Sequence, residues 1–346
     1  MNTPAAHGFR MPPEWAPHER TWMAWPGPNF TFGAEGDDTL AEARRAWAAV
    51  ARAVRRYEPV TVVAGPGQLD GARALLGPGV DLVERPLDDA WMRDIGPTFL
   101  TDDQGRLAAV DWVFNGWGAQ EWAAWDRDAK IAEHVAGLAG ARSYATSLVN
   151  EGGGIHVDGE GTVLLTETVQ LDLGRNPGRT KEEVEAEIHA HLGTTKAIWL
   201  PRGLYADYGR FGTRGHVDIV AAFARPGVVM VHTQPDPDHP DHAICNEIAK
   251  MLRAATDARG RQLEVVEIPA PTVLEEGGEL VDYSYINHLQ CNGGIVLCAF
   301  DDPRDEEAAA IFRGLFPDRT VTLVDARTIF AAGGGIHCIT QQQPKV

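Results

Sequence analysis

The sequence has 346 residues, of which 44% are hydrophobic, and its 31 Lys and Arg residues against 49 Asp and Glu residues give a formal net charge of -18. This composition predicts a globular protein with a sizeable core and argues against disorder. The acidic balance also argues against nucleic acid and anionic membranes as partners and favours cationic ligands. No apolar segment has the length of a signal peptide or membrane helix, and four cysteines are too sparse for a disulfide framework, so we expect a cytoplasmic protein with reduced thiols.

The first predicted elements are a helix and a strand. Apolar residues follow the helical period at Leu40, Ala43, Trp47, Val50 and Val54, and the apolar run at 59–65 then predicts a strand. Four later segments each predict two strands joined by a hairpin; they span residues 93–112, 151–167, 215–233 and 285–300. Their turns read DDQG, DGEG, RPG and NGG, which are typical hairpin sequences.

Helices and further strands follow these hairpins. Thr180 and Glu183 have the spacing of a capping box, which predicts a helix that ends near Leu192, before a strand at 196–201. The same order predicts helices at 241–258 and 302–316, followed by strands at 263–271 and 320–326. Repeated ββαβ units are therefore expected in one domain over residues 1–346, because no linker divides the chain.

The two ends of the chain decide the predicted architecture. If residues 331–344 pair with residues 21–26, the units number five and close into a ring without edge strands, an α/β propeller with five pseudo-symmetric blades. An ordinary mixed α+β domain is the alternative. In the ring, polar residues at the starts of strands converge on the axis. Those residues are Asp94, Glu151, His216, Asp218 and Cys338.

Cys338 is the candidate nucleophile. It follows three glycines in GGGIHC, which permit tight turns and close approach of a ligand to the main chain. A buried inert thiol is the alternative, and it is the interpretation that we give to the cysteines in apolar or helical contexts. Those are Cys245, Cys291 and Cys298.

His216 and Asp218 form an H-x-D pair that we expect on one face of a strand. A hydrogen-bonded structural histidine is one alternative for His216. Metal binding is another, with His156, Asp94 or Glu151 as a third ligand. No H-E-x-x-H motif or Cys/His cluster supports it, so no metal is expected.

The carboxylates indicate the ligand. Asp94 and Asp218 together can accept the planar fork of a guanidinium while the aromatic face of Trp91 covers it. Glu151 adds a third acid, and converging acids repel each other unless a cation lies among them. Each acid also has a purely structural interpretation when it is considered alone: Asp94 could form a salt bridge at the start of a strand, and Glu151 could be a turn residue. Together these residues favour a small cationic guanidino substrate.

Several long blocks of sequence are spread over nearly the whole chain. The blocks are PPEWAPHERTWMAWP, WMRDIGPTF, FNGWG, NEGGGIHVDGEGTVLLTE, RNPGRTKEEVE, GHVD, YINH, DDPRDEEAA and GGGIHCITQQQP. Together they resemble the agmatine deiminases of the guanidine-modifying superfamily. The resemblance implies a five-bladed α/β propeller of the pentein type, hydrolase activity and no cofactor. It also implies conversion of agmatine and water to N-carbamoylputrescine and ammonia, a reaction of polyamine biosynthesis.

The resemblance assigns a role to each candidate. Cys338 matches the nucleophile that forms a covalent amidino intermediate, and His216 matches the general acid and base. Asp94 and Asp218 match the carboxylates that bind the guanidinium, and Glu151 matches the acid that supports the histidine. Trp91, and Trp117 in FNGWG, are the candidate aromatic residues for substrate binding.

One segment departs from the family. Agmatine deiminases usually carry acidic residues shortly before the catalytic histidine, where they help to recognise the distal amine; this chain has Gly212, Thr213 and Arg214 there. If Arg214 points into the pocket, it would repel an ammonium and bind a carboxylate, which favours a guanidino acid or arginine as substrate. If Arg214 faces solvent or pairs with an acid such as Asp207, agmatine remains the expected substrate.

Three other functions remain open from the sequence. An amidinotransferase of the same superfamily would pass the amidino group to an amine and release no ammonia without one. A metal amidohydrolase would lose activity with a chelator. A non-catalytic ring-shaped binding protein, similar to ribosome anti-association factors, would not need a cysteine in a glycine-rich loop beside H-x-D. A homo-oligomer is compatible with the sequence.

Overall fold

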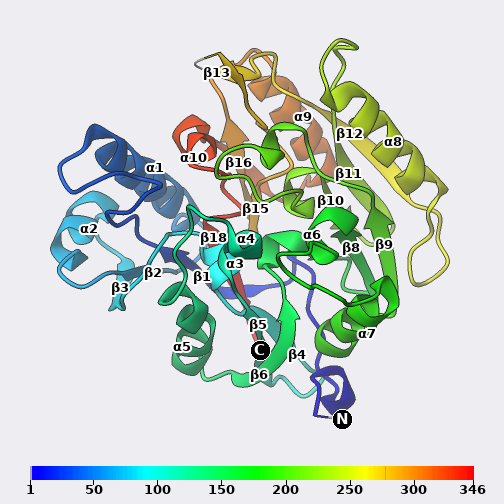
Figure 1. Ribbon diagram of the computed structural model, residues 1–346, viewed down its shortest axis with the longest axis horizontal. Coiled ribbons are helices and arrows are strands. Elements are labelled where there is room, and N and C mark those ends of the chain that lie inside the picture. The colour runs from blue at the N-terminus through cyan, green and yellow to red at the C-terminus, as the bar shows by residue number, and fades with distance from the viewer. Residues whose placement is uncertain (1, 277) are drawn as a thin grey trace.

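The computed structural model describes residues 2–276 and 278–346 (Figure 1). Its N-terminal sheet has the strand order β18-β1-β2-β3. The strands are β1 (His18–Ala24), β2 (Val60–Ala64), β3 (Val80–Glu84) and β18 (Thr340–Pro344). Helices α1 (Asp38–Val54) and α2 (Leu69–Leu76) connect the parallel strands. The apolar face predicted for the first helix is buried in α1, so the periodicity is confirmed.

Four further sheets in the described residues contain three strands each. Their strands are β4 (Thr98–Thr101), β5 (Leu107–Val113) and β6 (Arg142–Val149); β7 (His156–Val157), β8 (Thr162–Thr166) and β9 (Lys196–Leu200); β10 (Ala221–Arg225), β11 (Val228–Thr233) and β12 (Glu264–Pro269); and β15 (Leu289–Cys291), β16 (Gly294–Ala299) and β17 (Thr320–Asp325). A two-stranded hairpin is formed by β13 (Glu275–Glu276) and β14 (Glu279–Leu280).

Each three-stranded sheet repeats one plan. The first two strands pair antiparallel and the second and third pair parallel. A parallel partner requires a crossover, and a helix supplies it in each case. These helices are α5 (Ile131–Leu138), α7 (Lys181–Leu192), α8 (Asp241–Ala254) and α9 (Asp305–Leu315). The predicted ββαβ repeats are confirmed, and Figure 1 shows the crossover helices on the outside of the molecule.

The observed helix ends match the predicted ones where the sequence contains a capping motif. The capping box that opens α7 is present, because Thr180 Oγ1 accepts the N–H of Glu183 and Glu183 Oε2 accepts the N–H of Thr180. The expected extension of α8 to residue 258 is wrong, since α8 ends at Ala254. Ala255 takes an extended backbone after the helix, and Asp257 accepts the backbone N–H groups of Arg259 and Arg261 in the tight turn that follows.

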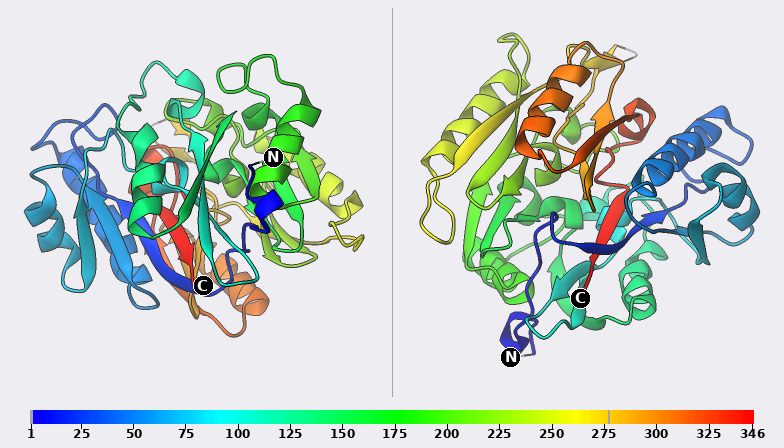
Figure 2. Two further views of the ribbon diagram at one scale, coloured as in Figure 1. Left: turned by 90° about the horizontal axis from the view of Figure 1, so that it is seen from below. Right: turned by 180° about the vertical axis from the view of Figure 1, so that it is seen from behind.

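The two ends of the described chain meet in one sheet. β1 pairs antiparallel with β18, from His18 opposite Pro344 to Met23 opposite Thr340. Figure 2 shows the red strand β18 beside the blue strand β1. This pairing was expected, and it brings the GGGIHC loop, which precedes β18, next to the N-terminal sheet.

Three short elements in the described part of the chain contain candidate residues: α3 (Met92–Ile95) contains Asp94, α4 (Gly116–Ala119) contains Trp117 and the 3-10 turn η5 (Val217–Ile219) contains Asp218. The other short elements are α6 (Glu167–Gln170), α10 (Arg327–Ala331) and the 3-10 turns η1 (Ala5–His7), η2 (Asp128–Lys130), η3 (Gly152–Gly154) and η4 (Ala206–Tyr208). The expected strand for the H-x-D pair is wrong, because η5 begins directly after His216 and contains Asp218. The strand β10 starts only at Ala221, after this turn.

Trp47 connects the core to the site. Its side chain is completely buried in α1 and packs edge-on against Trp91, with ring centroids 5.5 Å apart, and against Phe32 at 5.3 Å. Its indole N–H donates to the carbonyl of Ala90 at 3.3 Å. Within the described residues, no helix has the length and apolar character needed to cross a membrane.

We expect Trp47→Ala to lower the free energy of unfolding by about 3 to 5 kcal/mol, because it opens a cavity in the core beside Trp91. Leu138→Ala, at an exposed position at the end of α5, should change it by less than about 0.5 kcal/mol. Urea denaturation followed by circular dichroism measures both. Equal losses in the two variants would contradict the role given to Trp47.

Candidate active site

The five candidate polar residues converge around Gly153, in the turn η3. A β-carbon built on Gly153 would lie 2.5 Å from His216 Nδ1, 3.0 Å from Asp94 Oδ1 and 3.1 Å from Asp218 Oδ2. Only glycine can occupy this position, because a side chain would fill the space between the three polar groups. Segments that are far apart in the sequence therefore meet at one point.

The loop before β18 places Cys338. A β-carbon on Gly334 would come within 3.0 Å of both Cys338 Sγ and the ring of Trp91, so the glycine lets the loop pass between them. Asn287 fixes the thiol, since its Nδ2 donates to Cys338 Sγ at 3.2 Å and its Oδ1 accepts the N–H of His337 at 2.9 Å. The side chain of Cys338 is buried, with its residue 2% exposed.

The environment of Cys338 keeps its thiol protonated in the free protein. Burial raises its pKa well above the usual value, and the negative charges of Asp218 and Asp94 raise it further. Cys338 Sγ lies 3.7 Å from Asp218 Oδ2. A cation bound between the thiol and these acids would oppose both effects and lower the pKa.

His216 is held by an ion pair with Glu151. Its Nε2 lies 3.2 Å from Glu151 Oε2, and Arg175 Nε donates to both oxygens of Glu151 at 3.0 Å. Burial raises the pKa of Glu151, but the charges of Arg175 and His216 outweigh it and bring the pKa to about 2. Burial lowers the pKa of His216, yet Asp94 and Glu151 outweigh it and raise the pKa to about 9. His216 is therefore an imidazolium at neutral pH.

The two guanidinium-binding candidates are anchored differently. Asp94 Oδ2 accepts the indole N–H of Trp117 at 2.8 Å, and Asp94 Oδ1 accepts the N–H of Gly153 at 2.9 Å. Burial raises the pKa of Asp94 despite the positive charge of His216. Asp218 Oδ2 lies 2.7 Å from His337 Nδ1. Both acids are nearly inaccessible to solvent.

Two buried polar atoms at this point have no hydrogen-bond partner in the described part of the chain. They are Asp218 Oδ1 and His216 Nδ1. Burying a polar atom without a hydrogen bond is costly, so such atoms indicate a place for a ligand. Asp218 Oδ1 can accept a hydrogen bond, and protonated His216 Nδ1 can donate one, both next to the thiol. They suit a ligand whose N–H groups donate to the carboxylate and one of whose nitrogens takes up a proton.

The three candidates for substrate binding lie in different places. Trp91 borders the Cys338 loop, and Trp117 donates to Asp94, so both lie at the site. Trp117 adopts a positive φ of 55°, a strained backbone that directs its indole to Asp94. Arg214 instead pairs with Asp172 at 3.3 Å, and its side chain is 41% exposed. The structure therefore places Arg214 at the surface, on an acid.

Metal binding is disfavoured by the chemistry of the donors. Arg175 occupies both oxygens of Glu151, so this carboxylate already has a cationic partner. His156 Nδ1 accepts the N–H of Phe223 at 3.3 Å, and its Nε2 lies 3.9 Å from Glu14. Among the described residues, no group of three or more His, Cys, Asp or Glu side chains could hold a metal ion.

Sequence reasoning missed Arg175, Asn287 and His337 as site residues. Arg175 opens RNPGRT, Asn287 lies in YINH, and His337 immediately precedes Cys338, so each lies within a block that resembles the family. Their roles depend on partners brought close by the fold, which the blocks alone do not reveal.

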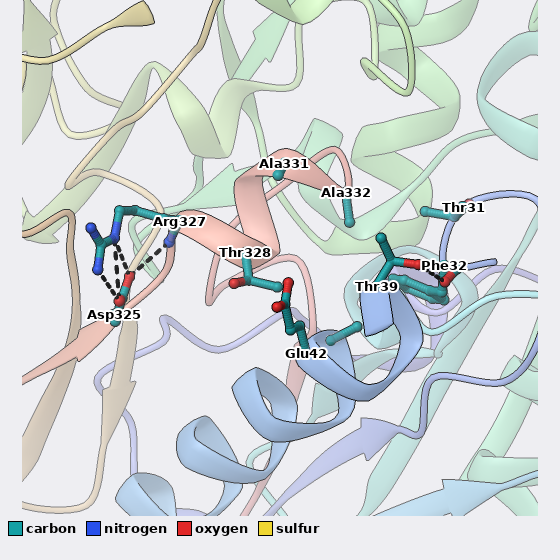
Figure 3. Close-up of a pocket in the computed structure, with 10 residues that line it drawn as sticks. Thr31, Phe32, Thr39, Glu42, Asp325, Arg327, Thr328, Ala331 and Ala332 are labelled. Atoms are coloured by element: carbon teal, nitrogen blue, oxygen red, sulfur yellow. Dashed lines mark hydrogen bonds and ion pairs between the residues drawn. The ribbon is translucent and has the colours of Figure 1, made fainter. Parts of the chain in front are cut away.

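An open cavity lies away from these residues. It has a volume of about 420 Å³ between α1 and α10 and is shown in Figure 3. Its lining residues are Thr31, Phe32, Thr39, Glu42, Ala43, Asp325, Arg327, Thr328, Ala331 and Ala332. None of the candidate catalytic residues lines it. Phe32 connects it to the site by stacking on Trp91, with centroids 6.4 Å apart.

Comparison with known proteins places the chain in a family. Residues 10–344 match the model of the Porphyromonas-type peptidyl-arginine deiminases. A Streptomyces avermitilis protein, provisionally named an agmatine deiminase, is 74% identical over 347 residues, covering 100% of both chains. The agmatine deiminase of Stutzerimonas stutzeri is 44% identical over 366 residues, covering 99% of this chain and 97% of its own.

A solved structure has the same mixed α/β fold. It is that of the agmatine deiminase of Enterococcus faecalis catalysing its reaction, with a TM-score of 0.94 and 34% identity over 100% of this chain and 98% of that one. The chain therefore belongs to the Porphyromonas-type peptidyl-arginine deiminase family and, within it, groups with the agmatine deiminases.

Proposed function

We propose that this protein is an agmatine deiminase, which hydrolyses agmatine to N-carbamoylputrescine and ammonia through a covalent intermediate on Cys338. One observation carries the proposal: a buried thiol lies beside paired carboxylates and an imidazolium, and Asp218 Oδ1 and His216 Nδ1 have no hydrogen-bond partner in the described residues. The names of the relatives at 44% and 34% identity agree with it.

Guanidinium binding follows from the arrangement of the acids. Asp94 and Asp218 lie on either side of Gly153, and their charges match a planar cation with several N–H donors. Trp91 borders the same space and offers an aromatic face to the cation. Binding of the cation lowers the pKa of Cys338, so the thiol releases its proton to solvent only when substrate is present.

The first half of the reaction releases ammonia. The Cys338 thiolate attacks the guanidinium carbon and forms a neutral tetrahedral adduct. His216, charged in the free protein, gives its Nδ1 proton to one amino group, which leaves as ammonia. The remaining carbon stays bonded to sulfur as an S-alkylthiouronium, and His216 becomes neutral.

Water completes the reaction. Neutral His216 takes a proton from a water molecule as its oxygen attacks the thiouronium carbon. The second adduct expels the Cys338 thiolate, which takes up the proton that the product loses, so that the ureido compound and the resting thiol are formed together. Glu151, itself held by Arg175, stabilises the charged form of His216 at each turnover.

The surroundings favour a substrate with an ammonium tail over one with a carboxylate tail. The charge of Arg214 is already matched by Asp172. Asp282, after β14, is a partly buried acid whose pKa is raised by burial and by the negative charges of Asp207, Asp241 and Asp218. A cation near this group of acids would relieve their repulsion, whereas a carboxylate would add to it. Agmatine therefore fits better than a guanidino acid or arginine.

We also propose how the repeated units are arranged around the site. Five units, of which the first is closed by the β1–β18 pairing, would surround the site as a five-bladed propeller in one domain over residues 1–346. Each candidate catalytic residue precedes the first strand of its unit, and in such a ring these strand starts converge on the axis. We further propose that the protein acts in the cytoplasm.

We expect Cys338→Ala to lower kcat with agmatine by at least about a thousandfold, because no other group can form the covalent bond. Cys245→Ala, which alters a buried cysteine in α8, should retain activity. Acid quenching of the wild-type reaction should leave a mass increase equal to agmatine less ammonia on the peptide that contains Cys338. The same increase on the Cys291 peptide would refute the assignment.

The pH dependence should report His216. Its protonated form persists up to a pKa of about 9, so kcat/KM should fall as the pH rises through about 9. Glu151→Gln removes a negative charge that raises this pKa, and the fall should then begin at a lower pH. Arg313→Gln, at an exposed helix position, serves as control. An unchanged alkaline limb in Glu151→Gln would contradict the ion pair.

A comparison of substrates tests whether the site prefers an ammonium tail to a carboxylate tail. kcat/KM should be higher for agmatine than for 4-guanidinobutyrate or arginine, and Arg214→Ala should change this preference by less than about twofold. Asp282→Asn should reduce kcat/KM for agmatine by about tenfold, equivalent to about 1.4 kcal/mol, while leaving 4-guanidinobutyrate unaffected or improved. A loss of activity toward 4-guanidinobutyrate in Arg214→Ala would show that Arg214 binds the tail.

A further inference from the structure

Glu14 reaches the site from outside the repeated units. It lies before β1 in a segment without helix or strand, yet the residue is only 6% exposed. Glu14 Oε1 accepts the backbone N–H of Gln290 at 2.8 Å. Glu14 Oε2 lies 2.9 Å from His337 Nε2. The N-terminal segment thus places a buried carboxylate behind the residue that precedes Cys338.

His337 bridges two acids. Its Nδ1 lies 2.7 Å from Asp218 Oδ2, while its Nε2 faces Glu14. Both ring nitrogens face carboxylate oxygens, which only accept hydrogen bonds. A neutral ring has a single N–H and would turn a lone pair toward one of the oxygens, so the geometry requires the imidazolium. Glu14, His337 and Asp218 form a continuous buried chain, which we call the Glu14 relay.

The pKa values agree with this charge state. Burial and the positive charge of Arg93 lower the pKa of His337, but Glu14 and Asp218 outweigh them and raise it above its usual value. Burial raises the pKa of Asp218, but the hydrogen bond and charge of His337 outweigh it and lower the pKa. Glu14 is held well below its usual pKa in the same way, against its burial, by His337.

The histidines around the Glu14 relay do not supply the positive charge that His337 places between Glu14 and Asp218. The histidines near it are neutral, since burial lowers the pKa of His156 to about 3 and that of His288 to about 4. Arg93 Nη2 is buried and, in the described residues, has no hydrogen-bond partner. The remaining ionisable groups whose charges act on Asp218, or which it acts on, are His216, Arg93, Asp94, Asp282, Cys298 and Cys338.

We propose that Glu14 and His337 are positioning residues for the guanidinium, and that they act through Asp218. Glu14 keeps His337 charged; His337 in turn holds Asp218 Oδ2 and leaves Asp218 Oδ1 turned toward the substrate cation. Neither residue touches the reacting atoms. The inference rests on the proposed function, because it assigns the guanidinium to Asp218.

Binding to the Cys338→Ala protein separates the relay from catalysis. Agmatine and methylguanidine serve as probes, and calorimetry gives their Kd between pH 5.5 and 8. With the relay intact, Asp218 stays ionised, and the Kd of methylguanidine, which has no tail to reach Asp282, should vary by less than about twofold. In Cys338→Ala/His337→Gln, Asp218 loses its hydrogen-bonded cation, and only the smaller effects of the His216 and Arg93 charges still oppose its burial. Its pKa should rise, and binding at pH 6 should be about tenfold weaker than at pH 8.

A double-mutant cycle tests the order of the relay. Glu14→Gln preserves shape but removes the charge that keeps His337 protonated, so it should weaken binding less than His337→Gln. The two changes together should be no worse than His337→Gln alone, within about twofold, because Glu14 acts only through His337. Additive losses, or an unchanged pH profile in His337→Gln, would overturn the inference.

Glu58→Gln is the matched control. Glu58 is also a buried glutamate paired with a histidine, at 3.0 Å from His18, but it has no contact with Asp218. It should create no pH dependence of binding, and its thermal unfolding shows the cost of losing a buried pair. If His337→Gln does not fold, His337→Asn and Glu14→Asp provide the same comparison. Failure of both probes to bind Cys338→Ala with the relay intact would overturn the proposed function together with the inference.

Discussion

Buried negative charge is the constraint on which this site depends. Asp94, Glu151, Asp218 and Glu14 all lie out of contact with bulk solvent, where an unpaired carboxylate is strongly disfavoured. Three of them hydrogen-bond to a buried cation: Glu151 to Arg175 and His216, and Glu14 and Asp218 to His337. Asp94 Oδ1 lies 3.9 Å from His216 Nδ1, beyond hydrogen-bond distance. Asp94 accepts its hydrogen bonds from the neutral N–H groups of Trp117 and Gly153, and its pKa is raised. A bound cation would therefore stabilise the ionised form of Asp94 more than that of the other three acids.

This incomplete pairing explains how one site can hold both a resting thiol and a reactive one. Without substrate, the acids that surround Cys338 oppose the thiolate. In the proposed mechanism, the substrate supplies the missing positive charge, so the thiolate forms only when a guanidinium is bound. A thiol that is ionised at all times would be open to oxidation, whereas the raised pKa of the buried Cys338 favours the less reactive protonated form.

Much of this arrangement could be predicted from the sequence, and the limits of the prediction have physical causes. Hairpin turns and helical periods gave the repeated units, because these are local signals. The side-chain direction of His216 and Asp218 was expected from strand alternation, but a 3-10 turn sets it. Arg175, Asn287 and Glu14 act through contacts between distant segments, and no local pattern encodes those. The position of Arg214 depended in the same way on Asp172, which lies on a different loop.

The pairing of β1 with β18 also bears on how the protein folds. Trp22 donates to Gln343 across a separation of 321 residues. Closing so long a loop costs chain entropy that is recovered only when the contact forms, so such contacts tend to form late and slow the folding of a domain. Cys338 lies just before β18 and is buried by the same event. Until then its thiol lies in water with an ordinary acidity, and the time before closure is when this cysteine is most open to chemical damage.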